Sequence, residues 1–123
     1  SVYEIDGPFF FGIATKFDEM MRSTMQQKPL VRIIRMRKVP FIDSTGIHNL
    51  ETLIKSSQKE GIQIVLSGVQ PGVYKVLVNS DIVHLIGERN ICDHISKAVH
   101  LANTIVRDHA IIPAWRRNGG ATV

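Results

Sequence analysis

The feature that most constrains the fold is a regular alternation along the chain between β-rich apolar runs and stretches whose apolar residues recur at helical spacing. Runs such as 30–36 are rich in Ile, Val and Leu, as buried strands are, whereas 47–54 repeats its apolar residues every three or four positions, as one helix face requires. The order β-β-α-β-α-β-α-β-α predicts an α/β fold with a small mixed β-sheet and packed helices. We expect strands at 2–6, 9–11, 30–36, 62–66 and 82–86, and helices at 12–25, 43–60, 71–78 and 90–106.

Residues that start or stop helices support these boundaries. Pro29 ends the first helical stretch, and Gly61 stands where a left-handed C-terminal cap would follow the second helix. Asn90 is a good N-cap for the last helix, with Asp93 in its first turn. Periodicity is lost beyond Arg107, so we expect one domain at 1–106 and a flexible C-terminal tail at 107–123.

The chain is long enough to form one core without disulfides or metals, because it has 123 residues of which 44% are apolar. Its single cysteine, Cys92, favours a reducing compartment, and its place in the last helix predicts a small core residue. The longest charge-free run, Gly61 to Tyr74, has 14 residues, too few for a membrane-spanning helix. The chain begins at Ser1 without a signal peptide, and we expect it to be a piece of a longer protein.

The net charge of +4 is weak evidence for a nucleic-acid partner. Arg116 and Arg117 in the expected tail supply half of it. The densest basic stretch elsewhere, Arg32 to Lys38, has no interleaved aromatic residues on which bases could stack. We interpret these side chains as solvated groups at a strand end and its exit loop, and we expect no nucleic-acid partner.

Sequence patterns typical of catalysis or metal binding are missing. The five histidines form no His-x-x-x-His pair, so a helical zinc site is unsupported, and we interpret His94 and His100 as helix-surface residues. Gly7 and Gly12 match the outer glycines of a phosphate-binding loop, but Ile13-Ala14 stand where Lys and Ser/Thr are needed. The chain has no Gly-x-Gly-x-x-Gly and no Gly-x-Ser-x-Gly. We therefore expect no enzyme activity, no metal and no cofactor.

The segment most suggestive of function is Val39–Gly46, in which an apolar strand exit leads into Asp43-Ser44-Thr45-Gly46 at a helix start. Helix starts expose unpaired N–H groups and a positive dipole end, which suit an anion or a phosphorylated side chain. A structural role explains the same residues, because Asp, Ser and Thr are common N-caps and Gly46 would allow the helix to pack closely on the sheet. The residue pattern by itself favours capping and does not decide the function.

This segment, Val39-Pro40-Phe41-Ile42-Asp43-Ser44-Thr45-Gly46, resembles the Asp-Ser/Thr-Ser/Thr-Gly loop of the STAS domain. The family is shared by bacterial anti-sigma factor antagonists and the cytoplasmic C-terminal ends of SulP anion permeases. The resemblance runs from about Val2 to Ile105 and includes Gly68-Val69-Gln70-Pro71. Antagonists usually carry a polar stretch after the first strand, whereas Gly7-Pro8-Phe9-Phe10-Phe11-Gly12 is similar to the permease pattern. The resemblance implies the STAS fold and a non-catalytic regulatory domain of a bacterial SulP-type sulfate or related anion permease, at the cytoplasmic face of the inner membrane.

The resemblance also implies site residues and partners. The antagonists' phosphate acceptor precedes the loop glycine and corresponds to Thr45, with Ser44 as its neighbour. In a permease domain the implied docking surface runs from Asp43 to His48, with Ile47 and His48 contacting the partner. We expect the transmembrane portion of the parent permease as partner, together with an unidentified cytosolic protein and an anion or nucleotide ligand. The alternative is a free-standing antagonist phosphorylated in this loop by an anti-sigma kinase, and a small nucleotide-binding or hydrolytic α/β domain is a third class.

Overall fold

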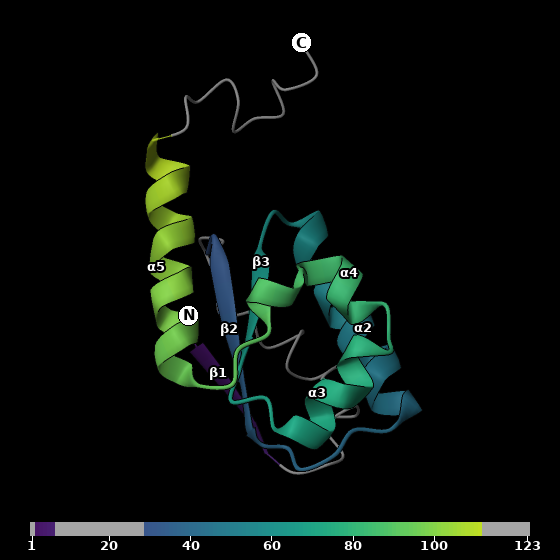
Figure 1. Cartoon of the computed structure of the whole chain (residues 1–123). Helices are drawn as coiled ribbons and strands as arrows, with labels where there is room; N and C mark the ends of the chain where they lie inside the picture. The colour runs from purple at the N-terminus through teal and green to yellow at the C-terminus, as the bar shows by residue number, and fades with distance from the viewer. Residues whose placement is uncertain (1, 7–28, 112–123) are drawn as a thin grey trace.

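The described strands form a parallel β-sheet with helices on both faces (Figure 1). The computed structural model describes residues 2–6 and 29–111. The strand expected at 9–11 and the helix expected at 12–25 lie outside the described residues. A small sheet with helices packed against it confirms the predicted α/β class.

The sheet has the order β1-β2-β3 among the described strands, and both pairings are parallel. In this sheet Arg35 is the register partner of Glu4 on one side and of Ser67 on the other. Parallel strands end at the same edge, so the carboxyl ends of β2 and β3 lie together. The strands are β1 (Val2–Asp6), β2 (Val31–Lys38) and β3 (Gln63–Ser67), close to three of the predicted ranges.

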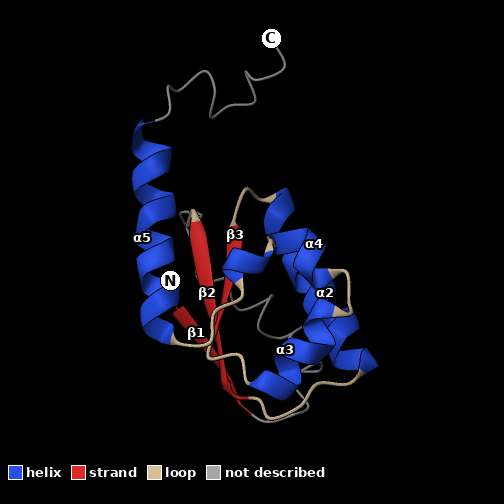
Figure 2. Cartoon of the chain, in the orientation of Figure 1, coloured by secondary structure: helices blue, strands red, loops and turns tan. Residues whose placement is uncertain are grey.

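Three of the described helices cover one face of the sheet, and Figure 2 shows them together on one side of the strands. They are α2 (Ser44–Lys59), α3 (Pro71–Val78) and α4 (Ile82–Ile86). The core on this face joins alternate residues of β2 and β3 to the helices, among them Ile34, Met36, Leu50, Ile54, Ile64, Leu66, Val73 and Leu77. Alternation places these side chains together because successive strand residues point to opposite faces.

Arg32 lies on this same face and is only 3% exposed, so it is not one of the solvated basic side chains that the sequence predicted. Its Nη1 donates a hydrogen bond of 3.3 Å to Oγ of Ser57, a buried residue of α2. The charged group enters the protein because its position in β2 alternates with Ile33 and shares a face with Ile34. Hydrogen bonding to a helix side chain offsets part of the cost of burying it.

The opposite face is covered by α5 (Ile95–Ile111), which lies on the other side of β2 from α2, α3 and α4 in Figure 1. Buried residues of the strands and the helix form a second core, which consists of Val31, Ile33, Val65, Cys92, Ala98 and Ile105. Cys92 is therefore a small core residue, as predicted, although it lies before α5 and not within a helix.

The segment 82–86 is the helix α4, and the prediction of a strand there is wrong. The Ser80 hydroxyl accepts a hydrogen bond of 3.2 Å from the Ile82 N–H, and Ile82, the first residue of α4, is fully buried. A run of five residues rich in Ile, Val and Leu fits a strand or a buried helical turn equally well. The place beside β3 is taken instead by Ile91, which forms a parallel bridge with Leu66.

The last helix begins later and ends later than predicted. Asn90 ends a short 3-10 helix, η1 (Glu88–Asn90), and its side chain donates to the Ile64 carbonyl at 3.1 Å, so it does not cap α5. The helix starts at Ile95, which leaves Asp93 outside its first turn, and continues past Arg107 to Ile111. No Gly or Pro interrupts 107–111, so the helix extends beyond the predicted domain boundary at residue 106.

Candidate functional site

The loop singled out in the sequence lies at the N-terminus of α2, and Asp43 is the N-cap. Its backbone is extended, with φ −97° and ψ −179°, and its Oδ1 accepts a hydrogen bond of 2.8 Å from the Gly46 N–H. The Asp43 carbonyl accepts another of 2.9 Å from the Ile47 N–H. The capping role considered from the sequence is therefore present.

Gly46 is buried because the first turn of α2 packs against the end of the strand exit. A Cβ at this position would lie 2.7 Å from Cγ1 of Ile42, closer than carbon atoms pack. The glycine thus permits a close approach of helix and loop. Together with the Asp43 cap, this contact fixes the orientation of the loop.

The capped turn presents most of the predicted site residues to solvent. Asp43, Ser44, Thr45 and His48 are exposed, whereas Ile47 is half-buried and packs against the core beneath α2. Phe41, two residues before the cap, is 53% exposed. We call Phe41, Asp43, Ser44, Thr45 and His48 the α2 surface. It combines one large apolar side chain with two hydroxyls, a carboxylate and an imidazole.

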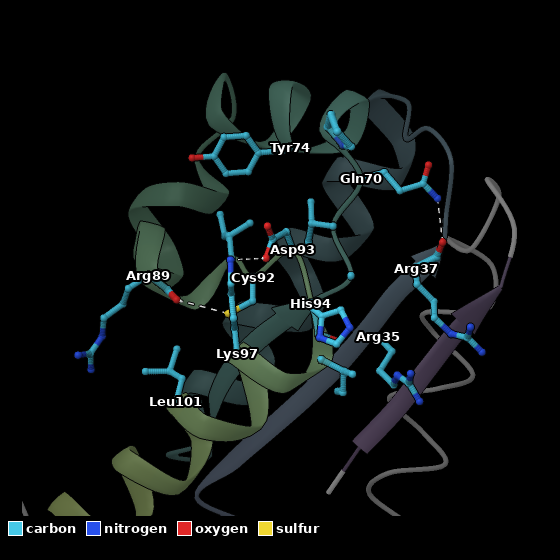
Figure 3. Close-up of a pocket in the computed structure, with 16 residues that line it drawn as sticks. Arg35, Arg37, Gln70, Tyr74, Arg89, Cys92, Asp93, His94, Lys97 and Leu101 are labelled. Carbon is cyan, nitrogen blue, oxygen red and sulfur yellow. Dashed lines mark hydrogen bonds and ion pairs between the residues drawn. The ribbon is translucent and has the colours of Figure 1, made fainter.

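A second candidate site, which the sequence did not predict, is a hollow of about 1190 Å³ at the carboxyl ends of β2 and β3 (Figure 3). We call it the β2–β3 pocket. Its side chains come from the two strands, the start of α3 and the residues that lead into α5. The polar side chains that line it include Arg35, Ser67, Gln70, Asp93, His94 and Lys97.

The wall of this pocket is fixed by contacts between β2 and the loop that follows β3. Gly68 has φ +64°, and a Cβ there would lie 2.8 Å from Cβ of Arg37, so only glycine fits without strain. The amide Nε2 of Gln70 donates to the Arg37 carbonyl at 2.8 Å. The loop between β3 and α3 is thereby held against the end of β2.

Three residues before α5 form the opposite wall. Asp93 forms an ion pair of 2.9 Å with Lys97, which lowers the pKa of the Asp93 carboxyl and raises the pKa of the Lys97 amine. The His94 ring caps the helix, because its Nδ1 accepts a hydrogen bond of 3.0 Å from the Ser96 N–H. Burial, and then the Asp93 charge, raise the pKa of the Cys92 thiol, which disfavours the reactive thiolate.

Among residues 2–6 and 29–111, no group of three His, Cys, Asp or Glu side chains is placed to hold a metal ion. None of the helices in the same part of the chain is both long enough and apolar enough to cross a bilayer.

Sequence reasoning missed Arg35 and Ser67 as candidate site residues. Arg35 belongs to the basic stretch that the sequence predicts to be solvated, but it is only partly exposed and shares the α5 face of β2 with Val31 and Ile33. Two features identify Arg35 as a site residue. Side chains alternate between the two faces of β2, which places Arg35 on the α5 face, and β2 pairs in parallel with β3. That pairing sets Arg35 opposite Ser67 and cannot be read from either strand alone.

Comparisons with known proteins agree with this architecture. The model of the STAS domain family matches residues 1–102. Sulfate transporter 1.1 of Arabidopsis thaliana is 40% identical over 82 residues, which make up 65% of this chain and 13% of that protein. The structure of the SulP transporter STAS domain from Vibrio cholerae is 39% identical, with a TM-score of 0.80 over 87% of this chain and 83% of that one.

A more distant structure, the murine anion transporter Slc26a9 in the inward-facing state, is 23% identical with a TM-score of 0.67, over 84% of this chain and 18% of that one. At this identity it shows a common fold alone. The chain thus spans a small part of the transporters it matches, 13% of the Arabidopsis protein. With the family model covering both the Asp43–Gly46 loop and the β2–β3 pocket, the chain belongs to the STAS domain family, and its relatives are SulP-family sulfate transporters.

Proposed function

We propose that this STAS domain is a non-catalytic regulatory and protein-interaction domain of a SulP-type sulfate or related anion transporter, at the cytoplasmic face of the inner membrane. The observation that carries the proposal is its similarity to sulfate transporters in which the matching part is a minor share, 13% in the Arabidopsis protein. The 39% identity to a STAS domain of a SulP transporter supports the same placement.

The α2 surface is the docking site in this proposal. Its polar side chains stand on a turn held by the Asp43 cap and by the packing of Gly46, so little conformational freedom is lost when a partner binds. Phe41 adds exposed apolar area, and aromatic side chains are enriched where proteins bind each other. The partner is the transmembrane portion of the parent transporter or a cytosolic protein.

A phosphate on Thr45 is the modification that would act most strongly on this surface. It would bring about −1.5 to −2 charges close to Asp43, and the dipole at the start of α2 would offset part of the repulsion. Because Ser44 and Thr45 are exposed, the added group would stay in solvent. We therefore expect it to change partner affinity more than fold stability.

The exposed Thr45 hydroxyl also supports the second candidate, an antagonist switched by phosphorylation. In that case an anti-sigma kinase would phosphorylate Thr45 or Ser44 in the isolated chain. Intact-mass measurement after incubation with candidate kinases tests this function directly. No added phosphate, with a known antagonist phosphorylated in parallel, would argue against it.

The parent gene tests the main proposal. We expect hydrophobic membrane spans to be encoded upstream of Ser1 in the same open reading frame. A reading frame that begins close to Ser1 without such spans would contradict the transporter proposal and favour the antagonist.

A further inference from the structure

We propose that the β2–β3 pocket is a binding site for a doubly charged tetrahedral oxyanion of the sulfate or phosphate class, free or as the end group of a larger molecule. The site is separate from the α2 surface and does not depend on the proposed function. It lies where parallel strands end, at the edge of the sheet at which α/β proteins commonly bind ligands.

The buried hydroxyl of Ser67 distinguishes the β2–β3 pocket from an ordinary surface depression. The residue is 1% exposed and lines the pocket, yet its Oγ forms no hydrogen bond with any described residue. A buried hydroxyl without a partner is costly, and protein interiors rarely retain one without a use for it. A ligand oxygen in the pocket would give this hydroxyl its partner.

Arg35 brings a positive charge to the same pocket. It is the register partner of Ser67, and both residues occupy the face of the sheet that α5 covers. A planar guanidinium binds two oxygens of a sulfate or phosphate group at once, which a halide, with a single atom, does not allow. Among the residues whose side chains the structure describes, Asp93 lines the pocket and is paired with Lys97, and Glu88 accepts a hydrogen bond from the pocket residue Tyr74.

The two helix starts at the pocket add neutral donors. Nδ1 of His94 accepts from the Ser96 N–H, so Nε2 carries the proton of the neutral ring and is a donor. At the start of α3 the Gln70 side chain makes no cap to the helix and bonds to Arg37 instead. The first turn of α3 therefore keeps N–H groups and a dipole that favour an anion.

Arg89 is a matched control residue for Arg35 (Figure 3). Arg35 and Arg37 extend from β2 on one side of the pocket, whereas Arg89, on the other side, points away from them. Arg35→Gln and Arg89→Gln change the net charge equally. Only Arg35→Gln removes the guanidinium of the residue that is the register partner of Ser67.

The test is a titration of the 123-residue chain with sodium sulfate and with sodium phosphate at constant ionic strength, followed by calorimetry and by amide NMR shifts. We expect saturable shifts centred on Arg35, Ser67 and His94. Arg35→Gln should weaken binding by about tenfold or more and Ser67→Ala by about threefold to tenfold, whereas Arg89→Gln should stay within about twofold of wild type. Ser67→Ala should not lower the unfolding temperature, because it removes an unpaired hydroxyl.

A phosphomonoester such as phenyl phosphate distinguishes the two sources of the anion. Tighter binding than inorganic phosphate, with the same dependence on Arg35, assigns the site to the end group of a larger molecule, and equal or weaker binding assigns it to the free ion. The proposal is overturned if neither ion gives saturable shifts at these residues, or if Arg89→Gln weakens binding as much as Arg35→Gln. Sodium chloride that produces the same shifts would also overturn it.

Discussion

The Asp43 carboxylate and the Gly46 N–H are joined by a hydrogen bond of 2.8 Å across the first turn of α2. This bond satisfies one of the helix's unpaired N–H groups and fixes the direction in which Ser44 and Thr45 leave the loop. The same residues that mark the family's loop thus have a structural role, whether or not a partner binds there.

Replacing Asp43 with alanine should lower the free energy of unfolding by about 1 kcal/mol, because the cap is lost. Asp43→Asn keeps an oxygen that accepts from the Gly46 N–H, so it should stay within a few tenths of wild type, roughly 0.3 kcal/mol. Urea unfolding at pH 7 measures both variants. Equal losses for alanine and asparagine would show that the hydrogen bond is not the source of the stability.

Gly46→Ala should destabilise the domain although alanine favours helices. The propensity gain is about 1 kcal/mol, but the new Cβ would meet Cγ1 of Ile42 at 2.7 Å. Such overpacking costs about 1–3 kcal/mol, so we expect a net loss of about 1 kcal/mol.

The contact with Ile42 can be isolated with a double-mutant cycle. In an Ile42→Ala background the Cβ that Gly46→Ala introduces has room, and we expect this substitution to be neutral or stabilising there. If Gly46→Ala costs the same stability in both backgrounds, the close approach of Gly46 and Ile42 does not explain the requirement for glycine.

The Asp93–Lys97 ion pair predicts a pH dependence. The pKa of Asp93 is lowered in the folded chain by the Lys97 hydrogen bond and charge, so its contribution is present above the ordinary carboxyl range and is lost as pH falls through the folded pKa. Both side chains are well exposed, so the effect should be small and should decrease with salt. We expect urea unfolding to give wild type a higher free energy of unfolding than Asp93→Asn at neutral pH, and the same free energy at acid pH. A difference that persists at acid pH would contradict this assignment.

The parts of the fold that could be predicted are those with a long, repeated signal. The helix α2 has a capping residue, a buried stripe through Leu50, Leu53 and Ile54, and Gly61 at φ +77° after its end, so its limits were close to the prediction. The strand β2 was equally clear because its run of Ile and Val is long.

The errors arose where a tertiary contact decided a short segment. Residues 82–86 resemble a strand, but burial of Ile82 under α2 and α3 favours a helix. Asn90 resembles an N-cap, but its amide bonds to Ile64, which is distant in the sequence. The β2–β3 pocket was missed for the same reason, since Arg35 and Ser67 meet only through strand pairing.

Cys92 should react slowly with Ellman's reagent in the native chain. It is 7% exposed, and burial raises the pKa of its thiol, so little thiolate is accessible near neutral pH. We expect the native rate to be on the order of 100-fold below the rate in urea. Comparable rates in the two states would show that the segment before α5 opens readily or that the thiol is not buried.

The central claim, that this domain regulates an anion transporter through the α2 surface, is tested most directly by sulfate uptake. The full-length parent transporter would carry Phe41→Ala or Thr45→Asp, with Val99→Ala on α5 as a control, since Val99 is also exposed at 40%. We predict that the two variants change the uptake rate by about fivefold or more at unchanged membrane abundance, and that the control does not. Uptake equal to wild type in both variants would contradict the account.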